Sequence, residues 1–294
     1  MGEYLNKKQR TVLIKFLAYL GLVRWQNLGI IALAQYLAAL FLLNKGKTWI
    51  EILSNPGLHF LVLSSSIIIA GGYLINAFYD IEKDLVNRPK KLIIGRIISK
   101  TFALNTYLLF NFIGLAIGFF LGWKVFLFYG VFTFLLWFYS HKLKKMPFIG
   151  NLTATFLSVC SFFVVCVYYW QLSWALILYV IFLVLAELIR EIVKDMEAIK
   201  GDIVFGYTTI SVVLGIRKTK NLIYALMALG ILPIYLVYHF QGWVPIMYFL
   251  LLAFFLWMIA AIMLAYSKER KDFAAVNTLL KVIIVLGVLS IGLV

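Results

Sequence analysis

Carboxylates are rare in this chain and are not scattered. Only 12 of the 294 residues are acidic, and eight of them fall in two short windows, each at the end of an apolar run. The eight are Asp80, Glu82, Asp84, Glu187, Glu191, Asp195, Glu197 and Asp202. Acidic side chains near hydrocarbon are costly and contribute little to membrane topology. We therefore interpret both windows as functional.

Helical spacing places the oxygen ligands of each window on one face. Asn76, Asp80 and Asp84 are four residues apart, so in a helix with 3.6 residues per turn each lies about 40° from the last. The members of the second window that share a stripe roughly 80° wide are Glu187, Glu191, Asp195 and Asp202. Two such rows facing each other would form an acidic cavity, in which carboxylates repel unless a cation binds.

Oxygen ligands favour a hard cation, Mg²⁺ before others. The predicted metal ligands are Asn76, Asp80, Asp84, Glu191, Asp195 and Asp202. Of these, the predicted catalytic carboxylates are Asp80, Asp84, Asp195 and Asp202.

Basic side chains accompany both rows. Magnesium beside lysine and arginine would hold a polyanionic diphosphate, although a single basic residue at a helix end is more often a topology signal or a lipid-headgroup contact. The predicted diphosphate-binding residues are Asn76, Arg88, Lys91, Arg96, Lys142, Lys144 and Lys194.

The elements that must position these residues are membrane helices. Hydrophobic residues make up 64% of the chain, and the apolar runs have the 18 to 24 residues that a helix needs to cross about 30 Å of hydrocarbon. The sequence predicts an all-α, multi-pass membrane protein with nine spans: 22–43, 58–79, 101–121, 125–140, 148–169, 173–193, 220–239, 243–266 and 274–293. Residues 1–21 are expected to form an amphipathic lead-in on the membrane surface, and residues 22–294 a single transmembrane domain.

The basic residues also orient the bundle. The N-terminus and every second loop carry 22 of the 27 lysine and arginine residues. The positive-inside rule therefore predicts a cytoplasmic N-terminus and, with nine spans, an external C-terminus in a prokaryotic cytoplasmic membrane. The net charge of +15 belongs to one membrane face, and no soluble module is left that would bind nucleic acid.

Three stretches resemble the UbiA superfamily of intramembrane prenyltransferases. NAFYDIEKD at 76–84, followed by NRP at 87–89, is similar to the first aspartate-rich motif of the superfamily, and REIVKDMEAIKGD at 190–202 to the second. YSHKLKKMPFIGN at 139–151 resembles the loop after the fourth helix. The likeness extends from about residue 20 to the end of the chain.

This resemblance implies nine helices around a central cavity that has a cytoplasmic cap. It also implies that the two motifs bind Mg²⁺ and, through it, the diphosphate of a polyprenyl donor, and that an acceptor within the lipid bilayer attacks the resulting allylic cation. REIVKD and the LKKMPFIGN loop look most like the branch that transfers a geranylgeranyl group to geranylgeranylglyceryl phosphate in ether lipid synthesis.

Two departures from the family pattern concern the metal site. Ala77 and Ala198 stand where the family usually has aspartate, and Glu191 and Asp195 lie on the same stripe as Ala198. Three other functions use similar features. They are transfer to an aromatic acceptor of quinone synthesis (hydroxybenzoate or dihydroxynaphthoate), cyclisation of the same diphosphate, and transport or lipid binding without catalysis.

Overall fold

The computed structural model describes residues 6–44, 46–87, 89, 92–171 and 174–293. Within these ranges the chain is helical and has no β-strand, and its single bridge joins Ile94 and Ile98. The helices are α1 (Lys7–Leu22), α2 (Trp25–Leu37), the π-helix η1 (Ala38–Leu43), α3 (Trp49–Leu53), α4 (Pro56–Tyr79), α5 (Ile81–Asn87), α6 (Lys100–Leu121), α7 (Trp123–His141), the 3₁₀-helix η3 (Leu143–Lys145), α8 (Ile149–Tyr169), α9 (Trp174–Val204), α10 (Ile210–Ala228), α11 (Ile231–Gln241), α12 (Ile246–Tyr266), α13 (Arg270–Leu289) and the 3₁₀-helix η4 (Ser290–Leu293). The predicted all-α class is confirmed.

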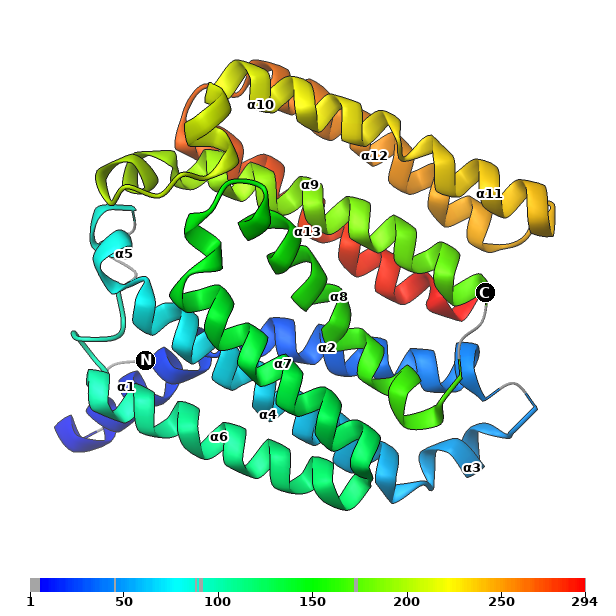
Figure 1. The fold of residues 1–294 in the computed structure, drawn as a ribbon, viewed down its shortest axis with the longest axis horizontal. Coiled ribbons are helices and arrows are strands. Elements are labelled where there is room, and N and C mark those ends of the chain that lie inside the picture. Colours follow the sequence, from blue (N-terminus) through cyan, green and yellow to red (C-terminus); the bar gives the residue numbers. More distant parts are fainter. Residues whose placement is uncertain (1–5, 45, 88, 90–91, 172–173, 294) are drawn as a thin grey trace.

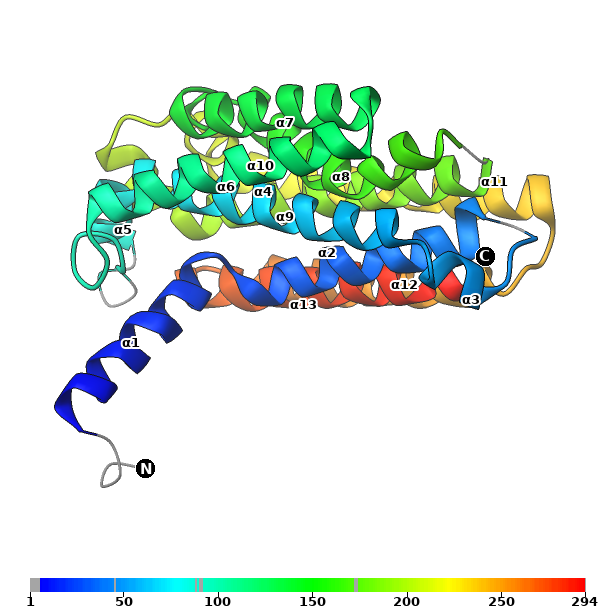
Figure 2. The same cartoon turned by 90° about the horizontal axis from the view of Figure 1, so that it is seen from below.

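The long helices pack side by side (Figure 1), and a central cavity lies between some of them. Helices α2, α4, α7, α8 and α9 supply the side chains that line this cavity. Helix α6 packs outside α4 and α7, whereas α13 lies between α9 and α2. Helix α1 leaves the bundle at an angle (Figure 2), so its apolar side chains Val12, Leu13, Phe16 and Leu17 are exposed.

Eight helical segments of the described chain are long and apolar enough to cross a membrane, which makes the protein an integral membrane protein. They coincide with eight of the nine predicted spans, although the segment that contains 220–239 is longer and runs over Ile210–Gln241. The remaining predicted span, 173–193, falls on α9 from Trp174 onward, and residue 173 lies outside the described residues. This helix has 31 residues and is therefore about 46 Å long. Its last third, about 16 Å, exceeds the length needed to cross an apolar core of about 30 Å and carries Asp195, Glu197 and Asp202.

Buried polar groups join the helices below the site. Gln35 of α2 donates to the Ser161 carbonyl of α8 at 2.8 Å, and Ser65 of α4 donates to the Gln35 side-chain oxygen at 2.8 Å. In α7, the Tyr129 hydroxyl lies 2.9 Å from that of Ser64. Hydrocarbon offers no other partners for these groups, so this network fixes how α2, α4, α7 and α8 face one another.

Candidate active site

One cavity brings the two acidic windows together. Its lining includes Asn76, Asp80 and Asp84 from the first window, and Glu191, Asp195 and Glu197 from the second. Its lysines are Lys83, Lys144 and Lys194. Two members of the predicted second row, Glu191 and Asp195, therefore share one space with the first row, although the windows are more than 100 residues apart in the sequence. The other two members, Glu187 and Asp202, do not line this cavity.

The first row follows the end of α4 and the start of α5. Helix α4 begins at Pro56 behind Asn55, whose side chain accepts from the Gly57 N–H, and it ends at Tyr79. The backbone then departs from helical geometry at Asp80. However, the Asp80 N–H still donates to the Asn76 carbonyl at 3.1 Å, and the Asp84 N–H donates to the Asp80 carbonyl at 2.8 Å. The predicted four-residue spacing therefore survives the break between the two helices.

Helix α5 is held against α9 by one asparagine. The Asn87 amide donates to the Ala198 carbonyl at 3.3 Å and accepts from the Gly201 N–H at 3.1 Å. Residue 201 must be glycine for this contact, because a Cβ there would overlap the Asn87 side chain. The Arg270 side chain of α13 donates to the Asn87 carbonyl. These bonds fix the distance between the two acidic rows.

Lys144 of η3 reaches the first row from the loop after α7. Its ammonium lies 2.6 Å from Asp80 Oδ1 and 3.5 Å from the Asn76 side-chain oxygen. The side chain is buried, and burial lowers the pKa of Lys144, an effect that the charge of Asp80 opposes. The sequence predicted Lys144 as a diphosphate-binding residue, and the structure places it among the carboxylates.

Lys83 lies between the rows and was not predicted. Its ammonium contacts Asp202 Oδ1 and lies 4.7 Å from the centroid of the Tyr207 ring. Asp202 is fully buried, and its other oxygen accepts from the Thr209 hydroxyl at 3.1 Å. The available sequence signal was the position of Lys83 three residues after Asp80, beside the acidic stripe.

The two central acids of α9 have different partners. The Asn151 amide of α8 donates to Asp195 Oδ2 at 2.7 Å, and no lysine or arginine of the described ranges forms an ion pair with this carboxylate. Glu191, by contrast, lies 2.9 Å from the Arg190 guanidinium and 2.8 Å from the Lys194 ammonium. Sequence reasoning missed Asn151, although it ends the loop motif at 139–151.

The remaining predicted diphosphate-binding residues have different placements. Lys194 lines the cavity and is also the partner of Glu191. Arg96 and Lys142 are exposed and do not line the cavity. Arg88 and Lys91 lie outside the described residues. The roles given to these residues stay predictions.

The donors in the cavity fit a hard cation. They are carboxylate and amide oxygens, without a thiol or an imidazole, which suits Mg²⁺. Within the described part of the chain, no three acidic, histidine or cysteine side chains form a ready metal cage. Mg²⁺ does not require a full set of protein ligands, because this ion is usually bound by one or two carboxylates together with water and substrate phosphates.

The central cavity begins beside the carboxylates and becomes apolar with depth. Asn76, Glu191 and Lys194 line its polar end, whereas Ile69 and Phe132 are among its apolar lining. Tyr139 lines both this cavity and the carboxylate cavity. Composition alone did not identify which aromatic residues face the interior. Together the two cavities suit an amphiphilic ligand whose anionic head lies in the carboxylate cavity, beside its lysines, and whose alkyl chain lies in the apolar part of the central cavity.

Comparison with known proteins gives a consistent match. Residues 32–283 match the family model of the UbiA prenyltransferase family. A protein of Sulfurisphaera tokodaii named digeranylgeranylglyceryl phosphate synthase is 33% identical over 182 residues, which are 60% of this chain and 64% of that protein. The protein of the same name from Methanothermobacter thermautotrophicus is 32% identical over 232 residues, which are 76% of this chain and 81% of that protein.

Solved structures share the fold. A UbiA homologue from Archaeoglobus fulgidus bound to GPP and Mg²⁺ has a TM-score of 0.66 and 17% identity, over 94% of this chain and 100% of that one. A structure described as giving insights into digeranylgeranylglyceryl phosphate synthase in membranes has a TM-score of 0.67 and 23% identity, over 94% of this chain and 97% of that one. At these identities the likeness shows the fold.

Proposed function

The chain belongs to the UbiA prenyltransferase family, and we propose that it is a Mg²⁺-dependent enzyme that transfers a polyprenyl group, geranylgeranyl first, from its diphosphate to the hydroxyl of a prenylglyceryl phosphate. The product class would be ether lipids. The names of the relatives at 32–33% identity support this acceptor, and the GPP and Mg²⁺ bound to a structural neighbour support the donor and the metal.

The observation that carries the proposal is the convergence of carboxylates and lysines at the mouth of an apolar cavity. Asp80 and Asp195 come from different windows, and Lys83 and Lys144 lie beside them in the same space. Such a mixture of charges is suited to a metal diphosphate, and the adjoining central cavity is suited to a prenyl chain. A carrier would more often place its acids near the bilayer midplane on interrupted helices.

In this proposal Asn76, Asp80, Asp84, Asp195 and Asp202 hold Mg²⁺, with Glu191 as a further candidate ligand. The bound ion would neutralise charge on the departing diphosphate.

Lys83, Lys144 and Lys194 bind the phosphate oxygens and stabilise the same developing charge. The allylic carbon–oxygen bond breaks with its electron pair remaining on the diphosphate. The acceptor oxygen then forms the new carbon–oxygen bond, and its proton passes to the released diphosphate. Tyr139 and Phe132 line the cavity, where their aromatic rings would shield the cation from water and stabilise it.

The same proposal includes the topology. Helix α9 supplies the ninth span over 173–193. Helix α5 and η3 form part of a cytoplasmic cap over the carboxylates, the N-terminus is cytoplasmic and the C-terminus external. Residues 1–21 lie on the surface of a prokaryotic cytoplasmic membrane, and residues 22–294 form one domain. The exposed apolar side chains of α1 support the surface assignment.

An acceptor screen tests the proposed reaction. Purified protein with Mg²⁺ and labelled geranylgeranyl diphosphate should release diphosphate in the presence of geranylgeranylglyceryl phosphate, and not with hydroxybenzoate or dihydroxynaphthoate. Asp202→Asn should abolish this release, because it removes a fully buried carboxylate of the second window. Release without any acceptor, together with a cyclic hydrocarbon product, would instead establish cyclisation.

A further inference from the structure

A second polar recess lies beside the carboxylate cavity. We call it the basic recess and define it by Arg24, Arg190, Lys194 and Lys281, which are the ionisable residues of its lining. They come from the junction of α1 and α2, from α9 and from α13. The hydroxyl of Thr278 also lines the recess. Since Arg24 and Lys194 line the carboxylate cavity as well, the two spaces share a wall.

The basic recess carries positive charge that the protein does not neutralise. Arg190 and Lys194 are paired with Glu187 and Glu191. Arg24 stacks 5.0 Å from the centroid of the Tyr73 ring. Among the described residues, neither Arg24 nor Lys281 has a carboxylate within ion-pair distance. Two basic side chains are therefore left for an anion, and a phosphate monoester carries about −1.5 to −2 charges at pH 7.

Lys281 is the least expected member of the basic recess. It lies within an apolar stretch of α13, between Leu280 and Val282, and its side chain is only partly exposed. An ionisable side chain inside a membrane span is costly, and it is usually retained for a ligand or a partner. The charged groups that act on Lys281 are Arg24, Arg190 and Glu187, so its surroundings are more basic than acidic.

An apolar cavity continues from the same lysine. We call it the side cavity. Its polar lining includes Lys281, Arg190 and the Glu187 carboxylate that pairs with Arg190. Ile30, Leu183, Ile284 and Val288 are among its apolar lining. It runs between α2, α8, α9 and α13. A ligand that fills both spaces has an anionic head in the basic recess and an alkyl chain in the side cavity. Its head then lies next to the carboxylate cavity through the shared Arg24 and Lys194.

We propose that the basic recess binds the phosphate group of the acceptor, with the acceptor's alkyl chain in the side cavity and its hydroxyl turned toward the carboxylates. This inference rests on the proposed function and names the site that selects a phosphorylated acceptor. In a glyceryl phosphate the phosphate and the free hydroxyl share one three-carbon backbone. A phosphate held at Lys281 and Arg24 therefore keeps the hydroxyl near the shared wall.

Lys281→Met tests the site, because it removes the charge and retains most of the side-chain volume. The measured quantity is the phosphate preference, which is the ratio of kcat/KM for geranylgeranylglyceryl phosphate to kcat/KM for the dephosphorylated alcohol. We expect this preference to fall about tenfold or more, the usual effect of losing a charge-assisted hydrogen bond, while the KM of the donor is unchanged. Lys281→Arg should retain the preference.

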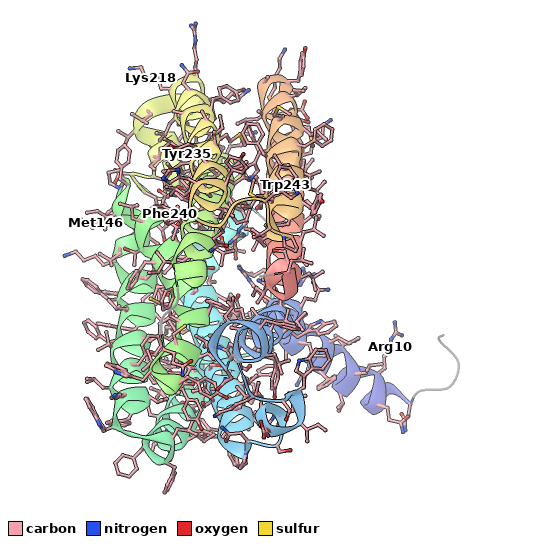
Figure 3. All side chains as sticks on the ribbon, turned by 90° about the vertical axis from the view of Figure 1, so that its right-hand side faces the viewer. Arg10, Met146, Lys218, Tyr235, Phe240 and Trp243 are labelled. Carbon is pink, nitrogen blue, oxygen red and sulfur yellow. The ribbon has the colours of Figure 1, made fainter. Side chains whose placement is uncertain are left out.

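Lys218→Met is the matched control. It makes the same change on an exposed residue of α10, which is labelled at the top of Figure 3 and does not line the basic recess. An unchanged phosphate preference in Lys281→Met would overturn the proposal. A rise in the donor KM as large as that in the acceptor KM would also overturn it, because the recess would then serve the donor diphosphate.

A binding measurement separates this site from the proposed reaction. Without donor, geranylgeranylglyceryl phosphate should raise the midpoint of thermal unfolding of the detergent-purified wild type and of Lys218→Met, and raise it less in Lys281→Met. Equal stabilisation of all three proteins, or equal stabilisation by phosphatidylglycerol, a phosphodiester, would reject a site for the acceptor phosphate. A wild type that shows Lys281-dependent stabilisation but no turnover would reject the proposed reaction and support the site.

Discussion

Replacing Lys144 by methionine would test whether a lysine and a metal ion hold the same carboxylate. The Lys144 side chain is 6% exposed, and its ammonium lies 2.6 Å from Asp80 Oδ1, whose side chain is 18% exposed. The substitution removes the ammonium and leaves most of the apolar stem. Asp80 then remains as a largely buried charge without its partner.

The expected loss of stability follows from this burial. Removing one partner of a fully buried ion pair costs about 3–5 kcal/mol, chiefly because the remaining charge is uncompensated. Asp80 retains some solvent contact, so we expect the lower end, about 3 kcal/mol in EDTA. The double variant Lys144→Met/Asp80→Asn should lose less than the single variant, since its neutral amide does not need a cation. With Mg²⁺ the loss in Lys144→Met should shrink, because the ion supplies positive charge beside Asp80.

Denaturant unfolding of the detergent-purified protein measures these differences. The wild type, the single variant and the double variant are each compared in EDTA and in Mg²⁺. The reasoning would be refuted if the double variant were less stable than Lys144→Met. It would equally be refuted if Mg²⁺ stabilised the wild type and Lys144→Met by the same amount, because Asp80 would then not be shared between the lysine and the ion.

Three further substitutions test other parts of the site. Gly201→Ala should displace Asn87 and separate α5 from α9, which lowers both stability and activity. Gly130→Ala, with open space around its Cα in the interior of α7, should leave activity unchanged and should not lower stability. Equal behaviour of the two variants would contradict the role given to the Asn87–Gly201 contact. Ala198→Asp adds a carboxylate to the cavity lining and should tighten Mg²⁺ binding roughly tenfold, measured as the Mg²⁺ dependence of unfolding, because ligand charge sets affinity. Lys83→Met should raise the donor KM about tenfold, and an unchanged donor KM would exclude Lys83 from diphosphate binding.

The sequence predicted the helices and the two acidic rows because both depend on short-range patterns. Apolar runs of spanning length are sufficient to predict membrane helices, and four-residue spacing is sufficient to place Asn76, Asp80 and Asp84 on one face. The same spacing even persists through the backbone break at Asp80, where the helical hydrogen bonds continue into α5.

The partners of these carboxylates were less predictable because they depend on tertiary packing. Asn151 meets Asp195 only because α8 packs against α9. Lys83 meets Asp202 across 119 positions of the sequence only because α5 is held on α9. A stripe of like residues tells which face of a helix is polar, but it does not tell which element lies opposite that face.

The contacts of Lys83 and Lys144 bear on the two positions, 77 and 198, where the family usually has aspartate and this chain has alanine. Ala198 lines the carboxylate cavity without adding charge to it, whereas Ala77 packs against an apolar cluster outside it. Two of the acidic residues, Asp80 and Asp202, are each in contact with an ammonium group. Fewer carboxylates require less cation to balance them, and a lysine supplies one positive charge without a bound ion. If Ala198→Asp tightens Mg²⁺ binding while Lys83→Met raises the donor KM, metal and lysine contribute separately to holding the diphosphate in this chain.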